Sequence, residues 1–207
     1  MMNVIIHPTY FPNIAHFAAI LQADEVTLEM DDNYQNQTYR NRAFIYGSNG
    51  KLQLSIPVIH SQKDRQKYRD IKIFNSEKWQ LVHLRSLEAA YRTSPYFEFY
   101  EDDIQHLFSK KYDYLLDFNM KCLDVVCECL QIDLKTNKTV AYEKTISSKI
   151  DFRDLVNSRK EAQFEFDLYT QVFGDKYGFI SNLSILDLLF NEGTNALNYL
   201  NNQSKHL

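Results

Sequence analysis

The 207-residue chain has the length of one globular unit, and its 44% hydrophobic content is enough to build a sizeable core. The formal net charge of −4 argues against non-specific nucleic-acid binding, which requires a basic surface. The apolar runs are too short for a membrane span or a secretory signal, so we expect a cytoplasmic protein.

The chain starts with the pattern of a β-α-β unit. The β-branched run Val4-Ile5-Ile6 ends at His7-Pro8, as a buried strand does. Apolar residues at 14, 17, 18 and 21 share one helix face, and residues 24–30 alternate as in a half-buried strand. Parallel strands of such a unit end at one sheet edge, where ligands bind. The loops 7–12 and 31–42 should therefore lie at the same edge.

The pattern then changes from strands to helices. Residues 43–46 and 52–58 are predicted strands, joined by a turn whose Asn-Gly pair favours a hairpin. Residues 60–70 are predicted to form a polar loop, followed by another strand. Proline does not occur after Pro95, which favours a helical second half. The expected later elements are helices starting at Ser76 and Ser94, a helix over 111–130, a short strand within 134–140, a turn or short helix over 151–158, and a helix over 183–190 capped by Asn182.

These patterns predict an α/β fold, with a Rossmann-like or mixed sheet in about the first 75 residues and a predominantly helical C-terminal half. We expect one structural domain in which residues 1–75 carry the site and residues 76–207 pack on it. The three cysteines fall on the predicted 111–130 helix and lack the number and spacing of a zinc site or a disulfide framework. No metal is therefore expected, and the sequence assigns no cofactor and no oligomeric state.

A first polar cluster follows the first strand. Two prolines make the segment from His7 to Pro12 rigid, and His16 lies one turn into the next helix. His7 and Tyr10 are candidate site residues. The alternative is a packed aromatic turn with structural histidines. The spacing of the two histidines and the absence of glycine also differ from the histidine-containing phosphate-binding turn of nucleotidylyltransferases.

A second polar cluster follows the second strand. Its arginines can bind a carboxylate or phosphate, and its acidic residues can orient an amine. The alternative is a solvated loop with exposed ion pairs, each worth about 0–1 kcal/mol. Two tyrosines in the segment favour a site. The candidates are Asp32 for acid–base chemistry and, for substrate binding, Tyr34, Gln35, Tyr39, Arg40, Asn41 and Arg42.

A third pair of candidates lies on the first helix of the second half. Trp79 and His83 are about one turn apart and therefore share a helix face. His83 is a candidate for proton transfer and Trp79 for the site wall. The alternative is that both belong to the core.

Several motifs, spread in order over nearly the whole chain, resemble the WbqC-like protein family. They are Pro8-Thr9-Tyr10-Phe11-Pro12, the segment from Tyr34 to Arg42, Leu54-Ser55-Ile56-Pro57-Val58, Trp79 with His83, Ala90-Tyr91 with Ser94-Pro95-Tyr96-Phe97, and the segment from Asn182 to Gly193. Many members have Gln-Pro where this chain has His7-Pro8, and lysine where it has Asn36. The resemblance implies a bacterial cytoplasmic protein linked to O-antigen or other surface-polysaccharide assembly.

Three functions are compatible with these patterns. The first is a transferase that moves an acyl or aminoacyl group to the amino group of a nucleotide-linked sugar, with Arg40 and Arg42 as anion holders and Asp32 with His83 or His7 handling protons. The second is a nucleotidyltransferase-like enzyme that uses the first β-α turn and His16. The third is a non-catalytic partner of a glycosyltransferase.

Overall fold

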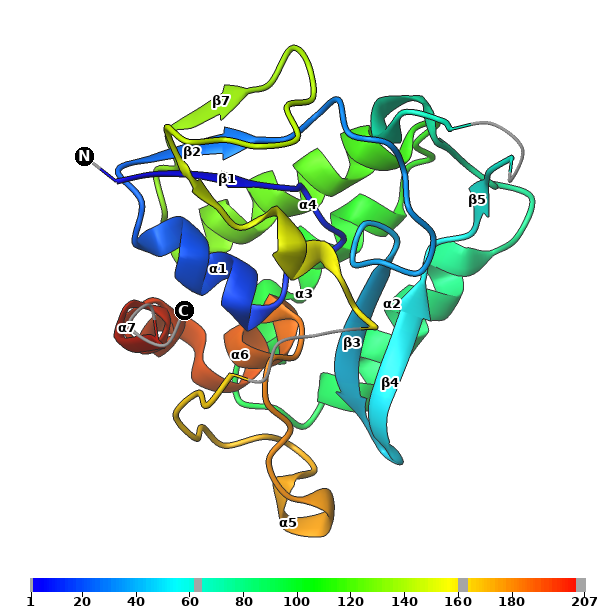
Figure 1. The fold of residues 1–207 in the computed structure, drawn as a ribbon. Helices are drawn as coiled ribbons and strands as arrows, with labels where there is room; N and C mark the ends of the chain where they lie inside the picture. Colours follow the sequence, from blue (N-terminus) through cyan, green and yellow to red (C-terminus); the bar gives the residue numbers. More distant parts are fainter. Residues whose placement is uncertain (1, 62–64, 160–163, 204–207) are drawn as a thin grey trace.

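The structure, a computed structural model, describes residues 2–61, 65–159 and 164–203. It confirms the α/β fold, with a parallel sheet, two small antiparallel pairs and helices that dominate the C-terminal half (Figure 1). Of the loop predicted over 60–70, residues 62–64 lie outside the described residues, and a 3-10 turn at Tyr68–Asp70 (η1) ends it.

The β-α-β unit at the start of the chain forms as predicted. It consists of β1 (Asn3–Ile6), α1 (Ile14–Leu21) and β2 (Glu25–Leu28), with the two strands parallel. The side chain of Asn13 accepts a hydrogen bond from the N–H of His16 and so caps α1. Caps of this kind stabilise a helix by about 1 kcal/mol.

Two strands from far along the chain complete this sheet. β7 (Thr136–Lys138) pairs with β2, and β8 (Ile150–Asp151) pairs with β1, both in parallel. The strand order is β7-β2-β1-β8. The chain therefore adds β2 and β7 on one side of β1 and then adds β8 on the other side. The carboxyl ends of the neighbouring strands β1 and β8 mark the topological switch point, where α/β proteins bind ligands.

The two faces of the sheet are covered differently. One set of alternate residues faces the hydrophobic core: Val4, Ile6, Val26 and Leu28. The other set, which includes Ile5 and Thr27, faces the connection between β7 and β8. The expectation that the second strand is half-buried is therefore wrong. Thr27 is only 2% exposed, because this connection covers the face that was expected to meet solvent.

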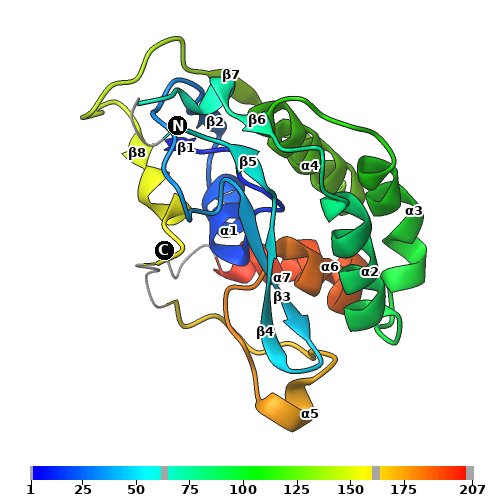
Figure 2. The same ribbon diagram turned by 90° about the vertical axis from the view of Figure 1, so that its right-hand side faces the viewer.

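Antiparallel pairs follow the β-α-β unit. The predicted hairpin consists of β3 (Arg42–Gly47) and β4 (Gly50–Ser55), and Gly50 has a φ of +98°, which glycine adopts without strain. β5 (Val58–Ile59) pairs with β6 (Lys72–Ile73). Figure 2 shows the hairpin extending away from the sheet towards α5 (Gly174–Tyr177).

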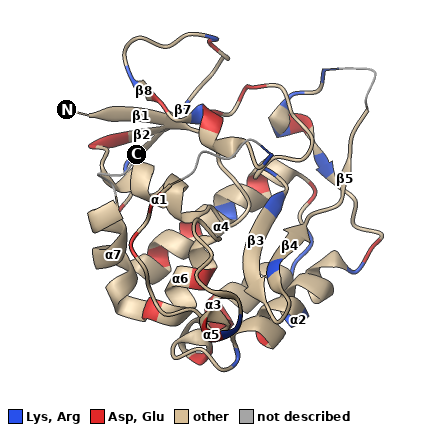
Figure 3. Cartoon of the chain, turned by 60° about the horizontal axis from the view of Figure 1, so that its bottom comes forward, with Lys and Arg blue, Asp and Glu red and all other residues tan. Residues whose placement is uncertain are grey.

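The remaining helices pack around α1 and the hairpin. They are α2 (Trp79–Tyr91), α3 (Phe97–Phe108), α4 (Leu115–Leu130), α6 (Ile185–Glu192) and α7 (Ala196–Gln203), with 3-10 turns η2 (Arg153–Val156) and η3 (Gly193–Asn195). None of the described helices is long and apolar enough to cross a bilayer. In the view of Figure 3, acidic and basic residues are interspersed along the elements.

Two predicted helix caps are wrong. α2 begins at Trp79, after Lys78, and Ser76 does not cap it. α6 is capped by Ser184, whose Oγ accepts from the N–H of Leu186 at 3.3 Å. Asn182 instead caps α1 from across the molecule, because its Oδ1 accepts from the N–H of Ala15 at 2.9 Å.

Candidate active site

The carboxyl ends of β1 and β2 bring together three of the predicted site residues. His7 follows β1, and Asp32 and Arg40 lie in the loop between β2 and β3. Nη2 of Arg40 donates to Oδ2 of Asp32 at 2.6 Å and lies 2.8 Å from Nε2 of His7. Nε2 of His7 lies 3.0 Å from Oδ2 of Asp32. The first two loops of the chain thus meet at one sheet edge.

The neighbours of His7 define its protonation state. The carbonyl of Arg153, 3.3 Å from Nδ1, and Oδ2 of Asp32, 3.0 Å from Nε2, can only accept, whereas Nη2 of Arg40, 2.8 Å from Nε2, can only donate. The neutral ring therefore has two compatible tautomers: one with the proton on Nδ1 and Nε2 accepting from Arg40, and one with the proton on Nε2, which then donates to Asp32. Burial and the charge of Arg40 lower the pKa of His7 to about 4. The imidazole is therefore neutral at pH 7, and protonation of Nε2 would replace the bond from Arg40 with one to Asp32.

Arg40 is a buried counter-ion to Asp32. Its side chain is 0% exposed, whereas that of Asp32 is 12% exposed. The Arg40 guanidinium lies 5.4 Å from the ring of Tyr68, and its Nε and Nη1 have no partner among the described residues. Burial opposes ionisation of Asp32, but His7 and the charge of Arg40 hold the pKa of its carboxyl below the usual value. Asp32 is thus the ionised group that faces outward from this cluster.

A polar cavity of about 290 Å³ opens above the cluster. It lies at the switch point, because His7 follows β1 and Asp151 ends β8. Its volume is close to the lower end of the range for small-molecule sites. The lining residues are His7, Asp32, Gln35, Arg40, Tyr142, Lys144, Asp151, Arg153, Asp154, Val156 and Asn157.

More than half of that lining comes from residues 142–157, which the sequence analysis did not select. The strand β8 has only two residues, which is too short for a periodic pattern that could predict it. The available signal was the charged segment Asp151-Phe152-Arg153-Asp154, which directly follows Ile150. Arg153 is central to this wall, since it is 7% exposed and its guanidinium donates to Asp151 at 2.6 Å.

Tyr10, Trp79 and His83 lie in the core and do not line the cavity. Burial lowers the pKa of His83 to about 4, and its ring also bonds to the backbone of Ser55. The Tyr10 hydroxyl donates to Nδ1 of His83 at 2.8 Å. Trp79 packs edge-on against His83 and Phe118. This aromatic cluster satisfies His83 internally and gives it no access to a substrate.

The remaining predicted binding residues surround the cluster without lining the cavity. Tyr34 is 7% exposed and stacks on Tyr68. Tyr39 joins two loops through its backbone, which accepts from the N–H of Tyr10 and donates to the carbonyl of Val156. Asn41 donates to the carbonyl of Ile56, and Arg42 begins β3. These side chains support the loop that presents Asp32 and Arg40.

The N-terminus of α1 is closed to phosphate. Its first N–H groups already donate within the protein: Ile14 to the carbonyl of Leu183, Ala15 to Asn182 and His16 to Asn13. Burial lowers the pKa of His16 to about 3, and Nδ1 of its ring bonds to Oδ1 of Asn13 at 2.7 Å. A nucleotide phosphate at this helix end would have to displace these bonds.

The cysteines lie on α4 as free thiols, with Cys122 and Cys127 buried. Burial raises the pKa of Cys127 to about 12, which leaves its thiol protonated and unreactive. Across the described ranges, no three histidine, cysteine or acidic side chains form a group that could hold a metal ion.

The strand order and the cavity define a mixed α/β protein with a parallel sheet and a small polar cavity at its switch point. The chain belongs to the WbqC-like protein family, whose model matches residues 7–164. It is 28% identical to the uncharacterized protein Rv1507c of Mycobacterium tuberculosis (strain ATCC 25618 / H37Rv), over 95% of this chain and 96% of that protein. No solved structure matches the chain.

Proposed function

We propose that the protein transfers an acyl or aminoacyl group to the amino group of a nucleotide-linked sugar during bacterial surface-polysaccharide assembly. The family resemblance supplies the polysaccharide context. The observation that carries the chemistry is the His7–Asp32–Arg40 cluster on the wall of a polar cavity at the switch point.

Asp32 and His7 act on the acceptor amine in this reaction, and the charge of Arg40 keeps Asp32 ionised. The ionised Asp32 holds the amino group of the acceptor in the cavity. As the amine nitrogen bonds to the acyl carbon, it loses a proton, which neutral His7 accepts at Nε2. Asp32, 3.0 Å away, stabilises the imidazolium. The proton then passes to the leaving group as its bond to the acyl carbon breaks.

The test is direct acylation of nucleotide-linked amino sugars, with thioester and aminoacyl-adenylate donors and mass spectrometry of the product. His7→Gln and Asp32→Asn should each lower kcat/KM by about 10²- to 10⁴-fold, the usual contribution of a general base. Arg92→Ala, which removes an exposed ion pair with Glu101, is the matched control and should have no effect.

Further results would favour one of the other two functions over acyl transfer. A protein that acylates no acceptor but co-purifies with a glycosyltransferase would be a non-catalytic partner, and the proposal would be wrong. ATP or CTP binding that depends on His16 would indicate nucleotidyl transfer. The protein-capped N-terminus of α1 gives that alternative no support.

A further inference from the structure

The connection between β7 and β8, residues 139–149, is called the strap here. It links two parallel strands without a helix, whereas such crossovers usually contain one. The strap crosses one face of the sheet and reaches the cavity, where it contributes Tyr142 and Lys144. Two of the cavity's side chains therefore come from a segment outside regular secondary structure.

Arg153 holds the strap in place. Its Nη1 donates to the carbonyl of Glu143 at 2.7 Å, and its Nη2 donates to that of Lys144 at 3.3 Å. Its Nε and Nη2 bind Asp151 at 2.9 and 2.6 Å. Its Nη1 also lies 3.4 Å from Oε2 of Glu29, so the guanidinium is fully engaged within the protein and is not free to bind a ligand.

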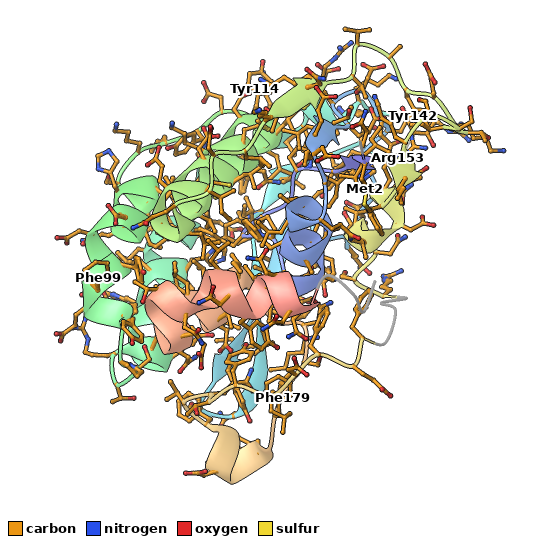
Figure 4. All side chains as sticks on the ribbon, turned by 90° about the vertical axis from the view of Figure 1, so that its left-hand side faces the viewer. Met2, Phe99, Tyr114, Tyr142, Arg153 and Phe179 are labelled. Atoms are coloured by element: carbon orange, nitrogen blue, oxygen red, sulfur yellow. The ribbon has the colours of Figure 1, made fainter. Side chains whose placement is uncertain are left out.

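Tyr142 packs on Arg153 with one face of its ring. The guanidinium carbon lies 5.0 Å from the ring centroid, and Figure 4 shows the two residues side by side. Tyr142 is nevertheless 41% exposed and lines the cavity. Because the contact with Arg153 already orders the Tyr142 ring, a ligand that stacks on the ring loses little binding free energy to ordering this side chain.

The remaining cavity wall suits a sugar. Gln35, Asp154 and Asn157 provide hydrogen-bond donors and acceptors for hydroxyl groups. An aromatic ring beside such groups can pack against the C–H face of a pyranose. The volume of about 290 Å³ has room for a pyranose ring, and the pocket wall opens to solvent, so the nucleotide of a bound nucleotide-linked sugar can extend out of the cavity.

Lys144 brings an ammonium group to the lining of the cavity, and an ammonium group can bind the phosphates of a nucleotide-linked sugar. It is exposed, lines the cavity, and has no acidic partner among the residues that the structure describes. An unpaired ammonium of this kind attracts a phosphate. The nearby Arg153 does not compete for the phosphate, because Asp151 already binds it.

We propose that the strap recognises the acceptor substrate: Tyr142 stacks on the pyranose ring, and Lys144 binds the diphosphate that joins the sugar to its nucleotide. This inference rests on the proposed function in taking a nucleotide-linked sugar as the acceptor. It goes further by naming two specificity residues.

The experiment is titration of the full chain with uridine diphosphate glucosamine, whose amino group is free, with the heat of binding measured by calorimetry. Tyr142→Ala should raise Kd about tenfold, the scale of aromatic stacking in water, and Tyr142→Phe should bind like the wild type because the ring is retained. Lys144→Ala should raise Kd roughly fivefold at low salt and have little effect at high salt.

Matched controls test whether the loss of any surface tyrosine or lysine raises Kd. Tyr177 on α5 is 42% exposed, and Lys176 lies 4.7 Å from its ring centroid, so Tyr177→Ala repeats the change away from the cavity. Lys121→Ala removes a surface lysine from α4. Both should leave Kd unchanged. The binding of free glucosamine, measured by saturation-transfer NMR, should be insensitive to Lys144→Ala because this sugar has no phosphate.

Several results would overturn the inference: no binding of the nucleotide-linked probe by the wild type, an unchanged Kd for Tyr142→Ala, or equal losses for Tyr142→Phe and Tyr142→Ala. The acylation assay separates it from the proposed function. Acylation by Tyr142→Ala with unchanged KM would refute the strap's role and leave the transfer intact. The expected Kd pattern without acylation would support the strap and refute the transfer.

Discussion

His7 and His83 are both buried, and both have a pKa of about 4, yet they lie in different surroundings. His7 contacts a carboxylate and a guanidinium beside a polar cavity. His83 contacts aromatic rings and the hydroxyl of Tyr10. Burial and a lowered pKa are thus common to a structural and a candidate catalytic histidine. Charged neighbours and an adjoining cavity are what distinguish them.

The largest expected effect concerns the buried charge beside His7. Arg40→Met should lower the free energy of unfolding by about 3–5 kcal/mol, because it leaves Asp32 without its counter-ion. Urea denaturation measures this change. The control is Arg92→Met, whose exposed pair with Glu101 is worth only about 0–1 kcal/mol. A loss as small as the control's would show that Arg40 and Asp32 are not coupled.

A smaller effect should follow from changing the histidine of the aromatic cluster. His83→Phe keeps the packing but leaves the Tyr10 hydroxyl without its acceptor, so we expect a loss of about 1–3 kcal/mol in unfolding free energy. The kcat/KM for acylation should stay within about twofold, since His83 does not line the cavity. A catalytic loss comparable to that of His7→Gln would contradict the distinction between the two histidines.

The free energy of unfolding should depend on pH through the lowered pKa values of His7 and His83. Their folded pKa is about 4 and the unfolded value about 6.5, so the unfolded state binds more protons between these limits. Stability is therefore present above pH 6.5 and lost as pH falls towards 4, by up to about 1.4 kcal/mol per pH unit for each histidine. His16, whose pKa burial lowers to about 3, adds to this trend, whereas the pKa of Asp187, raised by burial, opposes it.

Urea titrations between pH 4.5 and 7.5 measure that slope. His83→Phe should reduce it by about one histidine's share. An unchanged slope in His83→Phe would mean that this histidine is not held neutral by burial.

The smallest effect concerns the acidic residue next to Asp32 in the sequence. Asp31 pairs with Lys67 and Arg69, each at 2.9 Å, and the Arg69 side chain is 55% exposed. Arg69→Ala should therefore cost at most about 1 kcal/mol, and high salt should remove the difference. If Arg69→Ala lowered the free energy of unfolding as much as Arg40→Met, the exposed ion pair of Asp31 would contribute as much as the buried ion pair of Asp32, contrary to this prediction.

Local patterns predicted most elements correctly. The apolar period of residues 14–21 and the Asn-Gly turn act over a few residues, and the structure contains the corresponding helix and hairpin. The predicted cap of α6 was wrong because Asn182 binds a distant helix instead. Asn182 precedes α6 in the sequence, but its φ of +54° turns the chain so that its side chain reaches α1 instead.

The sequence alone determined that two loops follow two parallel strands, and parallel strands put His7 and Asp32 at one edge. The tertiary structure decided which side chains share the cavity. The two-residue strand β8 exists only through its pairing with β1, and it brings Arg153 to His7 from 146 positions away. No periodic pattern encodes such a contact, because periodicity reports the faces of one element, whereas sheet assembly sets the neighbours of that element.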